Sequence, residues 1–247
     1  MKKVLYARDK IRNNSLDFIQ NYITLWSEIY GDRLSGDDAS IRCGFGKLGD
    51  LTIAIAAQHT GHTFEERLKT HNGSTKAMGY RKMQRLLKIA EQWSLPLLCL
   101  IDTPGADASL QASLSNQSKA IADNLVCMAA YPFPSISVIM NQGMSGGAMA
   151  LAMADRLWMI EHAIFSVISP EGCAKIIWRD IAFAANAAEI LKMTAIELAE
   201  MKIIDEILPD NQFFLKQRLM STFVDLAEAN TEQRLYTRYH RWDKQCT

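Results

Sequence analysis

Two glycine-containing segments have the residue types needed to hold a negatively charged oxygen with backbone N–H groups. They are 101–107 (IDTPGAD) and 141–149 (NQGMSGGAM), and each follows an apolar run and precedes a helical pattern. Glycine lets a ligand approach the backbone closely. The amides of Gly146, Gly147 and Ala148 would begin a helix, whose N-terminus carries partial positive charge. This arrangement predicts an oxyanion hole.

The second segment also fits a different chemistry. Residues 143–147 (GMSGG) match GxSxG, the nucleophile elbow of α/β-hydrolases, and the expected strand–turn–helix context agrees. Ser145 would then be the nucleophile, with Asp205 and His240 as acid and base. His240 lies in a charged stretch (RLYTRYHRWDKQ), which is typical of a solvated helix face. From the pattern alone, both interpretations remain open.

Basic side chains gather on one expected helix, and they suit either a phosphate group or a solvated surface. They are Lys76, Arg81, Lys82, Arg85 and Lys88.

Metal and disulfide chemistry have weaker support. His59 and His62 have a spacing that would suit metal binding on a helix, but Gly61 between them argues against a helix there, so we expect no metal site. The cysteines are odd in number and none forms a CxxC pair, so we expect free, buried thiols. They are Cys43, Cys99, Cys127, Cys173 and Cys246.

The elements that must position these groups alternate between strands and helices. Helical patterns at 79–93, 118–130 and 148–154 are interleaved with apolar strands at 97–102 and 135–141. Such βαβ units predict an α/β fold with a mainly parallel sheet, in which ligands bind beyond the carboxyl ends of the strands.

Helix starts and the two ends of the chain complete this outline. Ser169-Pro170-Glu171 combines a cap, a proline and a first-turn acid, and Thr194 with Glu197 forms a capping box. The pattern divides the chain into a helical lead-in over 1–30 capped at Ser15, a central domain over 31–210 with strands at 156–168 and 203–208, and a helical tail over 211–247.

Composition excludes several classes of protein. The chain has 247 residues, of which 49% are hydrophobic, enough for one sizeable core. Lys+Arg and Asp+Glu both number 27, so there is no basic excess of the kind that nucleic-acid binders show. No apolar run approaches the ~20 residues that span a bilayer, and the charged N-terminus does not resemble a signal peptide. We therefore expect a cytoplasmic protein.

Several motifs together resemble one family, the α subunit of bacterial acetyl-CoA carboxylase carboxyltransferase. They are IDTPGA, GGAMALAMADR, SVISPEGCAKIIW, GYRKMQRLLKIAEQWSLPL and GDRLSGDDASI, and the similarity covers about 15–209. The resemblance implies a crotonase-type fold, a spiral of ββα units. It also implies a transferase that moves the carboxyl group of carboxybiotin, held on a separate biotin carboxyl carrier protein, to acetyl-CoA, giving malonyl-CoA for fatty-acid synthesis.

The same resemblance implies a β-type partner subunit that carries a zinc ribbon, an α₂β₂ hetero-oligomer, and no metal in this chain. The amides of Gly146, Gly147 and Ala148 would stabilise charge on the biotin ureido oxygen, so no serine nucleophile is needed. Biotin or substrate contacts would come from Gly105, Ala106, Gly143, Ser169, Glu171 and Gly172. Arg81, Lys82 and Arg85 would contact CoA phosphates or the carrier.

The chain departs from the family pattern in three places. The long N-terminal helical extension is missing or shortened, the loop 107–117 lacks a Tyr-Pro-Gly turn and an acidic pair, with Ser113 to Ser115 in their place, and 141–147 reads NQGMSGG. These changes suggest a divergent paralogue for a specialised pathway, such as polyketide-type synthesis. A malonyl decarboxylase is the nearest alternative within the same fold, and a non-catalytic pseudo-subunit with a regulatory or assembly role is a third possibility from a different functional class.

Overall fold

One mixed sheet organises the part of the chain that the computed structural model describes, residues 1–9 and 11–243. Its strands are β1 (Ile23–Ile29), β2 (Ile41–Leu48), β3 (Leu51–Gln58), β4 (Leu97–Thr103), β5 (Ser135–Met144), β6 (Arg156–Ile160), β7 (Ile164–Ser166) and β8 (Glu206–Leu208). They pair in the order β1-β2-β3-β4-β5-β6-β8, and β7 also pairs with β5. Pairing is antiparallel from β1 to β3 and parallel from β3 onward. The predicted α/β fold with a mainly parallel sheet is confirmed.

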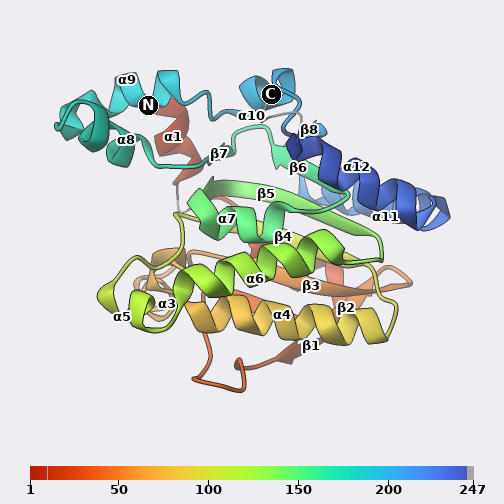
Figure 1. Cartoon of the computed structure of the whole chain (residues 1–247). Helices are drawn as coiled ribbons and strands as arrows, with labels where there is room; N and C mark the ends of the chain where they lie inside the picture. Colours follow the sequence, from red (N-terminus) through yellow and green to blue (C-terminus); the bar gives the residue numbers. More distant parts are fainter. Residues whose placement is uncertain (10, 244–247) are drawn as a thin grey trace.

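Helices connect and cover the strands. They are α1 (Lys2–Ala7), α2 (Ser15–Tyr22), α3 (Phe64–Lys69), α4 (Ala77–Gln92), α5 (Leu110–Leu114), α6 (Gln117–Ala130), α7 (Ser145–Ala152), α8 (Pro170–Ile177), α9 (Ala184–Ile190), α10 (Ala195–Glu200), α11 (Gln212–Glu228) and α12 (Thr231–Asp243), with short 3₁₀ turns at His71–Gly73 and Ile181–Phe183. Figure 1 shows α4, α6 and α7 side by side over one face of the sheet, with α8 and α9 at one end of the molecule and α11 and α12 at the other.

The core explains why these segments adopt these forms. Every residue of β4 and β5 is buried, as expected for parallel strands covered on both faces. The predicted stripe of α4 is buried as well, and it includes Met83, Leu86 and Leu87. Because β4 and β5 run parallel, they end at the same edge of the sheet. The segments that follow them, 104–109 and 145–147, therefore lie in the same region.

The lead-in over 1–30 differs from the prediction, because it is not helical throughout. Ile23–Ile29 forms β1, antiparallel to β2, in agreement with its β-branched and aromatic composition. The cap of α2 is Asn14, whose side chain accepts the amides of Leu16 and Asp17, and the adjacent Ser15 is fully buried. A side chain in the extended position just before the helix reaches these amides, and one in the first turn does not.

The later helix starts agree with the prediction. Ser169 caps α8 by accepting the amide of Gly172, and Thr194 forms a capping box with Glu197 at the start of α10. The tail is helical as far as Asp243, and Cys246 lies outside the described residues. Within the described ranges, no helix is both long and apolar enough to cross a bilayer.

Candidate functional site

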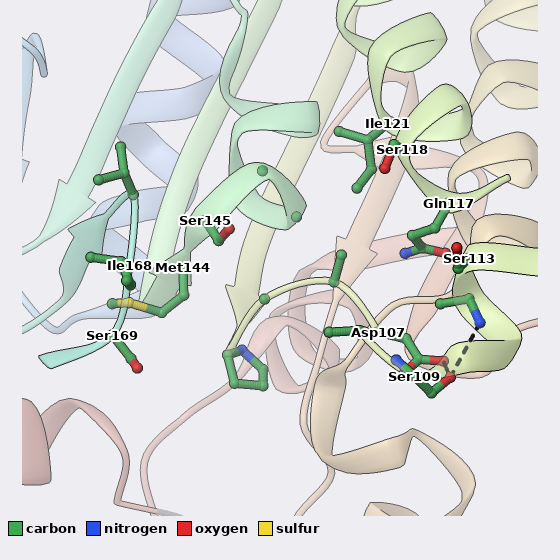
Figure 2. Close-up of a pocket in the computed structure, with 18 residues that line it drawn as sticks. Asp107, Ser109, Ser113, Gln117, Ser118, Ile121, Met144, Ser145, Ile168 and Ser169 are labelled. Carbon is green, nitrogen blue, oxygen red and sulfur yellow. Dashed lines mark hydrogen bonds between the residues drawn. The ribbon is translucent and has the colours of Figure 1, made fainter. Parts of the chain in front are cut away.

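A cavity of about 490 Å³ opens where the carboxyl ends of β4 and β5 meet the start of α6. Four segments line it: 104–109 after β4, residues of α5 and α6 between 112 and 121, 144–147 at the start of α7, and 167–169 before α8. Figure 2 shows Met144, Ile168 and Ser169 on one side of this cavity, Asp107, Ser109, Ser113 and Gln117 on the other, and Ser145 between them. The two predicted glycine-containing segments therefore lie at one site.

The first turn of α7 borders the cavity. The residue that precedes the helix, Met144, provides no side-chain hydrogen bond to cap it. The first amides of a helix have no partner within it, and they carry the positive end of the helix dipole. Gly146 and Gly147 line the cavity, and Ala148 is fully buried behind them. This turn has the geometry to stabilise an oxygen that becomes negatively charged.

Close packing between the two loops requires glycine at two positions. A Cβ on Gly147 would lie 2.5 Å from the Ala106 nitrogen and 2.9 Å from the Gly105 carbonyl carbon. Gly105 itself has φ of +128°, a conformation that residues with a Cβ rarely adopt. Its N–H already donates to the Thr103 hydroxyl at 3.0 Å, so Gly105 shapes the wall of the cavity without a free amide.

Ser145 lines the cavity but has no acid–base partner there. Its φ of +60° is unusual for a residue with a Cβ, as in a tight strand-to-helix turn. Asp205 instead accepts from Arg241 and from the Leu157 amide, and His240 lies 3.7 Å from Asp243. No histidine lies among the described residues that line the cavity. The triad of the hydrolase interpretation is therefore not assembled in this structure.

Residues of the loop 107–117 form one wall of the cavity. Ser109 caps the short helix α5 by accepting the Ala112 amide, and its own amide donates to Asp107 at 3.0 Å. Asp107 is the charged side chain among the described lining residues. Gln117, buried at the start of α6, donates to the Thr75 carbonyl at 2.8 Å. The wall is polar, and it carries no cation.

Of the remaining predicted contacts, some line the cavity and others do not. Ala106 and Ser169 line it. The Glu171 carboxylate forms two hydrogen bonds with Arg8, which lower its pKa, so this side chain ties α8 to the residue that follows α1. Gly172 lies inside α8 and donates to Ser169, and Gly143 packs within β5 against Phe165. Glu171, Gly172 and Gly143 therefore support the neighbouring walls and do not line the cavity.

Three basic side chains of α4 are engaged within the chain: Arg81, Lys82 and Arg85. Lys82 is fully buried, and its ammonium donates to the Asp37 carboxylate at 2.6 Å and the Asp38 carbonyl at 2.8 Å. Arg81 pairs with Asp32 at 2.8 Å, and Arg85 donates to the Tyr30 and Gly31 carbonyls. These cations hold the loop before β2 against α4, so their charges are directed into the chain and away from a bound CoA.

The histidines and thiols of the described residues do not line the cavity. His59 is buried, with its Nε2 2.8 Å from the Ala39 carbonyl oxygen. Burial lowers the pKa of His59 to about 4, so its imidazole is mainly neutral at pH 7. His62 lies 3.0 Å from Asp17. Cys43 and Cys99 are buried in the sheet, and burial raises the pKa of Cys43 to about 12, which makes that thiol unreactive. Within the described residues, no cluster of three or more acidic, histidine or cysteine side chains could hold a metal ion.

Asp102 is a buried acid that the sequence interpretation did not single out. It ends the apolar part of β4, and it accepts from the Asn141 side chain at 3.2 Å and the Gln142 amide at 3.4 Å. Burial raises its pKa to about 7. The signal was present in IDTPGAD, where an acid directly follows a continuous apolar strand, but nothing in the sequence showed its partners on β5.

Comparison with known proteins places the chain in a family. The acetyl co-enzyme A carboxylase carboxyltransferase-like family model matches residues 1–245. An acetyl-coenzyme A carboxylase carboxyl transferase subunit alpha from Ruminiclostridium cellulolyticum is 44% identical over 209 residues, covering 85% of this chain and 80% of that protein. A beta/alpha protein of the same enzyme from Clostridium tetani is 38% identical over 97% of this chain, which spans 44% of its length. The chain spans 65% of the alpha subunit from Rhodospirillum centenum.

Solved structures confirm the expected carboxyltransferase fold. Transcarboxylase 12S aligns with a TM-score of 0.75 at 17% identity, covering 90% of this chain and 43% of that one. A Pseudomonas malonate decarboxylase chain aligns with a TM-score of 0.70 at 16% identity, covering 86% of this chain and 90% of that one. These likenesses concern the fold, whereas the matched family model and the 44% identity decide the family. The chain belongs to the acetyl-CoA carboxylase carboxyltransferase-like family.

Proposed function

We propose that this chain is the α-type half of a carboxyltransferase, which moves a carboxyl group from carboxybiotin to acetyl-CoA and so forms malonyl-CoA. The observation that carries this proposal is the first turn of α7, which borders a 490 Å³ cavity with amides that no side chain caps. Carboxybiotin would supply the carboxyl group, from a separate carrier protein. A β-type subunit would complete the site and carry the zinc expected of the enzyme.

The chain's own residues support one part of this reaction. Loss of the carboxyl group leaves negative charge on the ureido oxygen, and the amides of Gly146, Gly147 and Ala148 would stabilise it without any change in side-chain protonation. Such fixed donors cost no reorganisation at the moment of reaction. Ala106 and Ser169 would form the walls that orient the ring.

The charge of the cavity fits a half-site. Among the described lining residues there is one ionisable side chain, the acidic Asp107. A neutral ureido ring is compatible with such a wall, whereas the phosphates of CoA call for cations. Arg81, Lys82 and Arg85 of α4 are engaged by Asp32, Asp37 and backbone carbonyls. The CoA phosphates would therefore be held mainly by the partner subunit.

Narrowing the cavity tests this assignment. The assay is malonyl-CoA decarboxylation by the complex with the β-type subunit, with biocytin as the carboxyl acceptor. Ser113 lies on the exposed part of the wall, so the larger side chain of Ser113→Trp should fill the cavity. This variant should slow turnover by about tenfold or more, in line with the cost of misplacing a reactant. Ser221→Trp, on the exposed face of α11, is the matched control and should leave turnover unchanged. Equal activity of both variants would place the reaction elsewhere.

The same assay distinguishes the alternatives. Ser145→Ala should retain turnover within about twofold, because no serine nucleophile takes part, whereas a true nucleophile would cost orders of magnitude. Folded Ser145→Ala without any turnover would revive the hydrolase interpretation. A wild-type chain that binds its partner but does not turn over would favour the non-catalytic subunit suggested by the loop 107–117.

A further inference from the structure

A buried polar network lies behind the first turn of α7, and the residues predicted from the sequence do not include it. Its centre is Thr75, which is fully buried just before α4. The Thr75 carbonyl accepts from the Asp107 amide at 3.0 Å and from the Gln117 side chain at 2.8 Å. A carbonyl oxygen has two lone pairs, so both are used. Thr75 thus holds the 104–109 loop and the start of α6, which form one wall of the cavity.

Gln58 connects Thr75 to the opposite wall. It ends β3, is fully buried, and its Nε2 lies 3.3 Å from the Thr75 hydroxyl and 3.1 Å from the Gly147 carbonyl. The orientation of this amide follows from chemistry, because a carbonyl oxygen can only accept and therefore requires the NH₂ group of Gln58. One buried side chain on β3 thus bonds to both sides of the cavity.

The position of this hydrogen bond matters for the cavity amides. The Gly147 carbonyl belongs to the same peptide group as the Ala148 N–H, one of the three proposed oxyanion donors. A hydrogen bond to a peptide carbonyl polarises that group and strengthens its N–H as a donor. Donation to the first turn of a helix also fixes its orientation. Gly147 is tightly packed, since a Cβ added to it would lie 2.5 Å from the Ala106 nitrogen and 2.8 Å from the Tyr80 hydroxyl.

We propose that Gln58 is a positioning residue, which orients and polarises the Gly147–Ala148 peptide and, with Thr75, keeps the two walls of the cavity in register. It does not touch the substrate. Its loss should therefore lower kcat and leave the KM for malonyl-CoA nearly unchanged, because it acts on charge that develops during the reaction.

Asn124 provides a matched control. It is fully buried in α6, and its Nδ2 donates to the Ala150 carbonyl at 2.6 Å, one turn further along α7. Both side chains are buried amides that donate to α7, but the peptide polarised by Asn124 lies outside the first turn. Replacement by an apolar side chain of similar size removes buried hydrogen bonds in both cases: Gln58→Met removes the bonds to Thr75 and Gly147, and Asn124→Leu removes the bond to Ala150. Both variants should therefore lose stability.

The kinetic test uses the complex with the β-type subunit, and this part rests on the proposed function. Gln58→Met should lower kcat about tenfold or more with KM within about twofold, the cost of weakening one oxyanion donor being at most 10²–10³. Asn124→Leu should keep kcat within about twofold, although it also loses a buried hydrogen bond and lowers the Tm. If Gln58→Met retains kcat, or if both variants lose it equally, the positioning role is wrong.

A second readout does not require activity. In the ¹⁵N-labelled chain, Gln58→Met should shift the Ala148 nitrogen resonance upfield, and Asn124→Leu should shift that of Leu151, the next residue after its carbonyl partner. If Gln58→Met leaves the Ala148 resonance unmoved, the inference is wrong, whether or not the protein is active. If Gln58→Met shifts this resonance but the wild-type complex shows no turnover, only the proposed function is wrong. Should Gln58→Met fail to fold, Thr75→Val removes the hydroxyl that holds Gln58 and should change kcat and the Ala148 resonance in the same direction.

Discussion

At the residue scale, Gly146 and Gly147 are neighbours with different surroundings. A Cβ on Gly146 would meet Ile121 at 3.6 Å, an ordinary contact. A Cβ on Gly147 would lie 2.5 Å from the Ala106 nitrogen. Because that nitrogen is a backbone atom, this clash can be relieved only by a shift of the backbone. The first glycine of the pair therefore leaves the wall open, and the second lets two backbone segments pack against each other.

This difference predicts unequal effects of the same substitution. Gly147→Ala should push the 104–106 loop away from α7, and the shift of about 1 Å that this demands should cost turnover about 10²-fold. It should also destabilise the fold by roughly 1–3 kcal/mol through overpacking. Gly146→Ala should leave the Tm nearly unchanged. Thermal unfolding and turnover of the two variants provide the check, and equal losses would contradict the packing described for Gly147.

Asp102 makes a prediction about pH. Its pKa is raised to about 7 by burial, so the folded state holds a proton that the unfolded state releases near pH 4. The folded state is therefore penalised as pH rises: stability is full below the unfolded pKa, and it falls until the pH passes the folded pKa. Asp102→Asn keeps an acceptor for Asn141 and Gln142 and removes the titration.

The unfolding free energies of wild type and Asp102→Asn should differ with pH accordingly. Between pH 5 and pH 8 the wild type should lose about 2–3 kcal/mol relative to the variant, from the linkage between the two pKa values. Chemical denaturation at the two pH values measures this. Parallel stabilities of the two proteins across the range would show that Asp102 is not buried as a neutral acid.

At the scale of elements, buried arginine side chains hold α12 against the rest of the fold. Arg238 is fully buried, pairs with Asp155 at 2.7 Å, and donates to the carbonyls of Met128, Ala129 and Tyr131 at the end of α6. The last carbonyls of a helix lack helical partners, so this guanidinium caps α6. The sequence analysis predicted that this charged stretch faces solvent, whereas the Arg238 side chain is fully buried in the structure.

Removal of this cap should be costly. Arg238→Met leaves Asp155 and the α6 carbonyls short of donors, and it should lower the free energy of unfolding by about 3–5 kcal/mol. The exposed pair of Lys119 and Asp123 is the control, since Lys119→Met should change stability by about 0.5 kcal/mol or less. Urea denaturation compares the two. A loss below about 1 kcal/mol for Arg238→Met would mean that α12 contributes little to the fold.

Much of the element order follows from sequence because local signals agree with the fold. The apolar runs of β4 and β5, the stripe of α4 and the cap at Ser169 are set by periodicity and capping chemistry, which short windows contain. β1 was missed because it directly continues α2, with no turn residue between them. Lys82 was placed at the surface because no local pattern shows that Asp37 and Asp38 fold back over it.

At the scale of the whole molecule, the cavity carries little charge, which agrees with the proposal that it forms one half of an active site. The cavity is lined by helix amides, small side chains and one acid, and the nearby cations Arg81 and Lys82 pair with Asp32 and Asp37. The glycine-rich turns could be recognised from sequence because their conformational demands are local. The Gln58 and Thr75 network could not, since it joins β3, the start of α4, α6 and α7 across the fold.

The most direct test is to co-purify this chain with a β-type subunit and to assay malonyl-CoA decarboxylation with biocytin as the carboxyl acceptor. Each subunit alone serves as the control. We expect acetyl-CoA to form only when both chains and biocytin are present. Acetyl-CoA formation by this chain alone, or failure of the two chains to associate together with hydrolase activity that Ser145→Ala abolishes, would contradict the assignment as the α-type half of a carboxyltransferase.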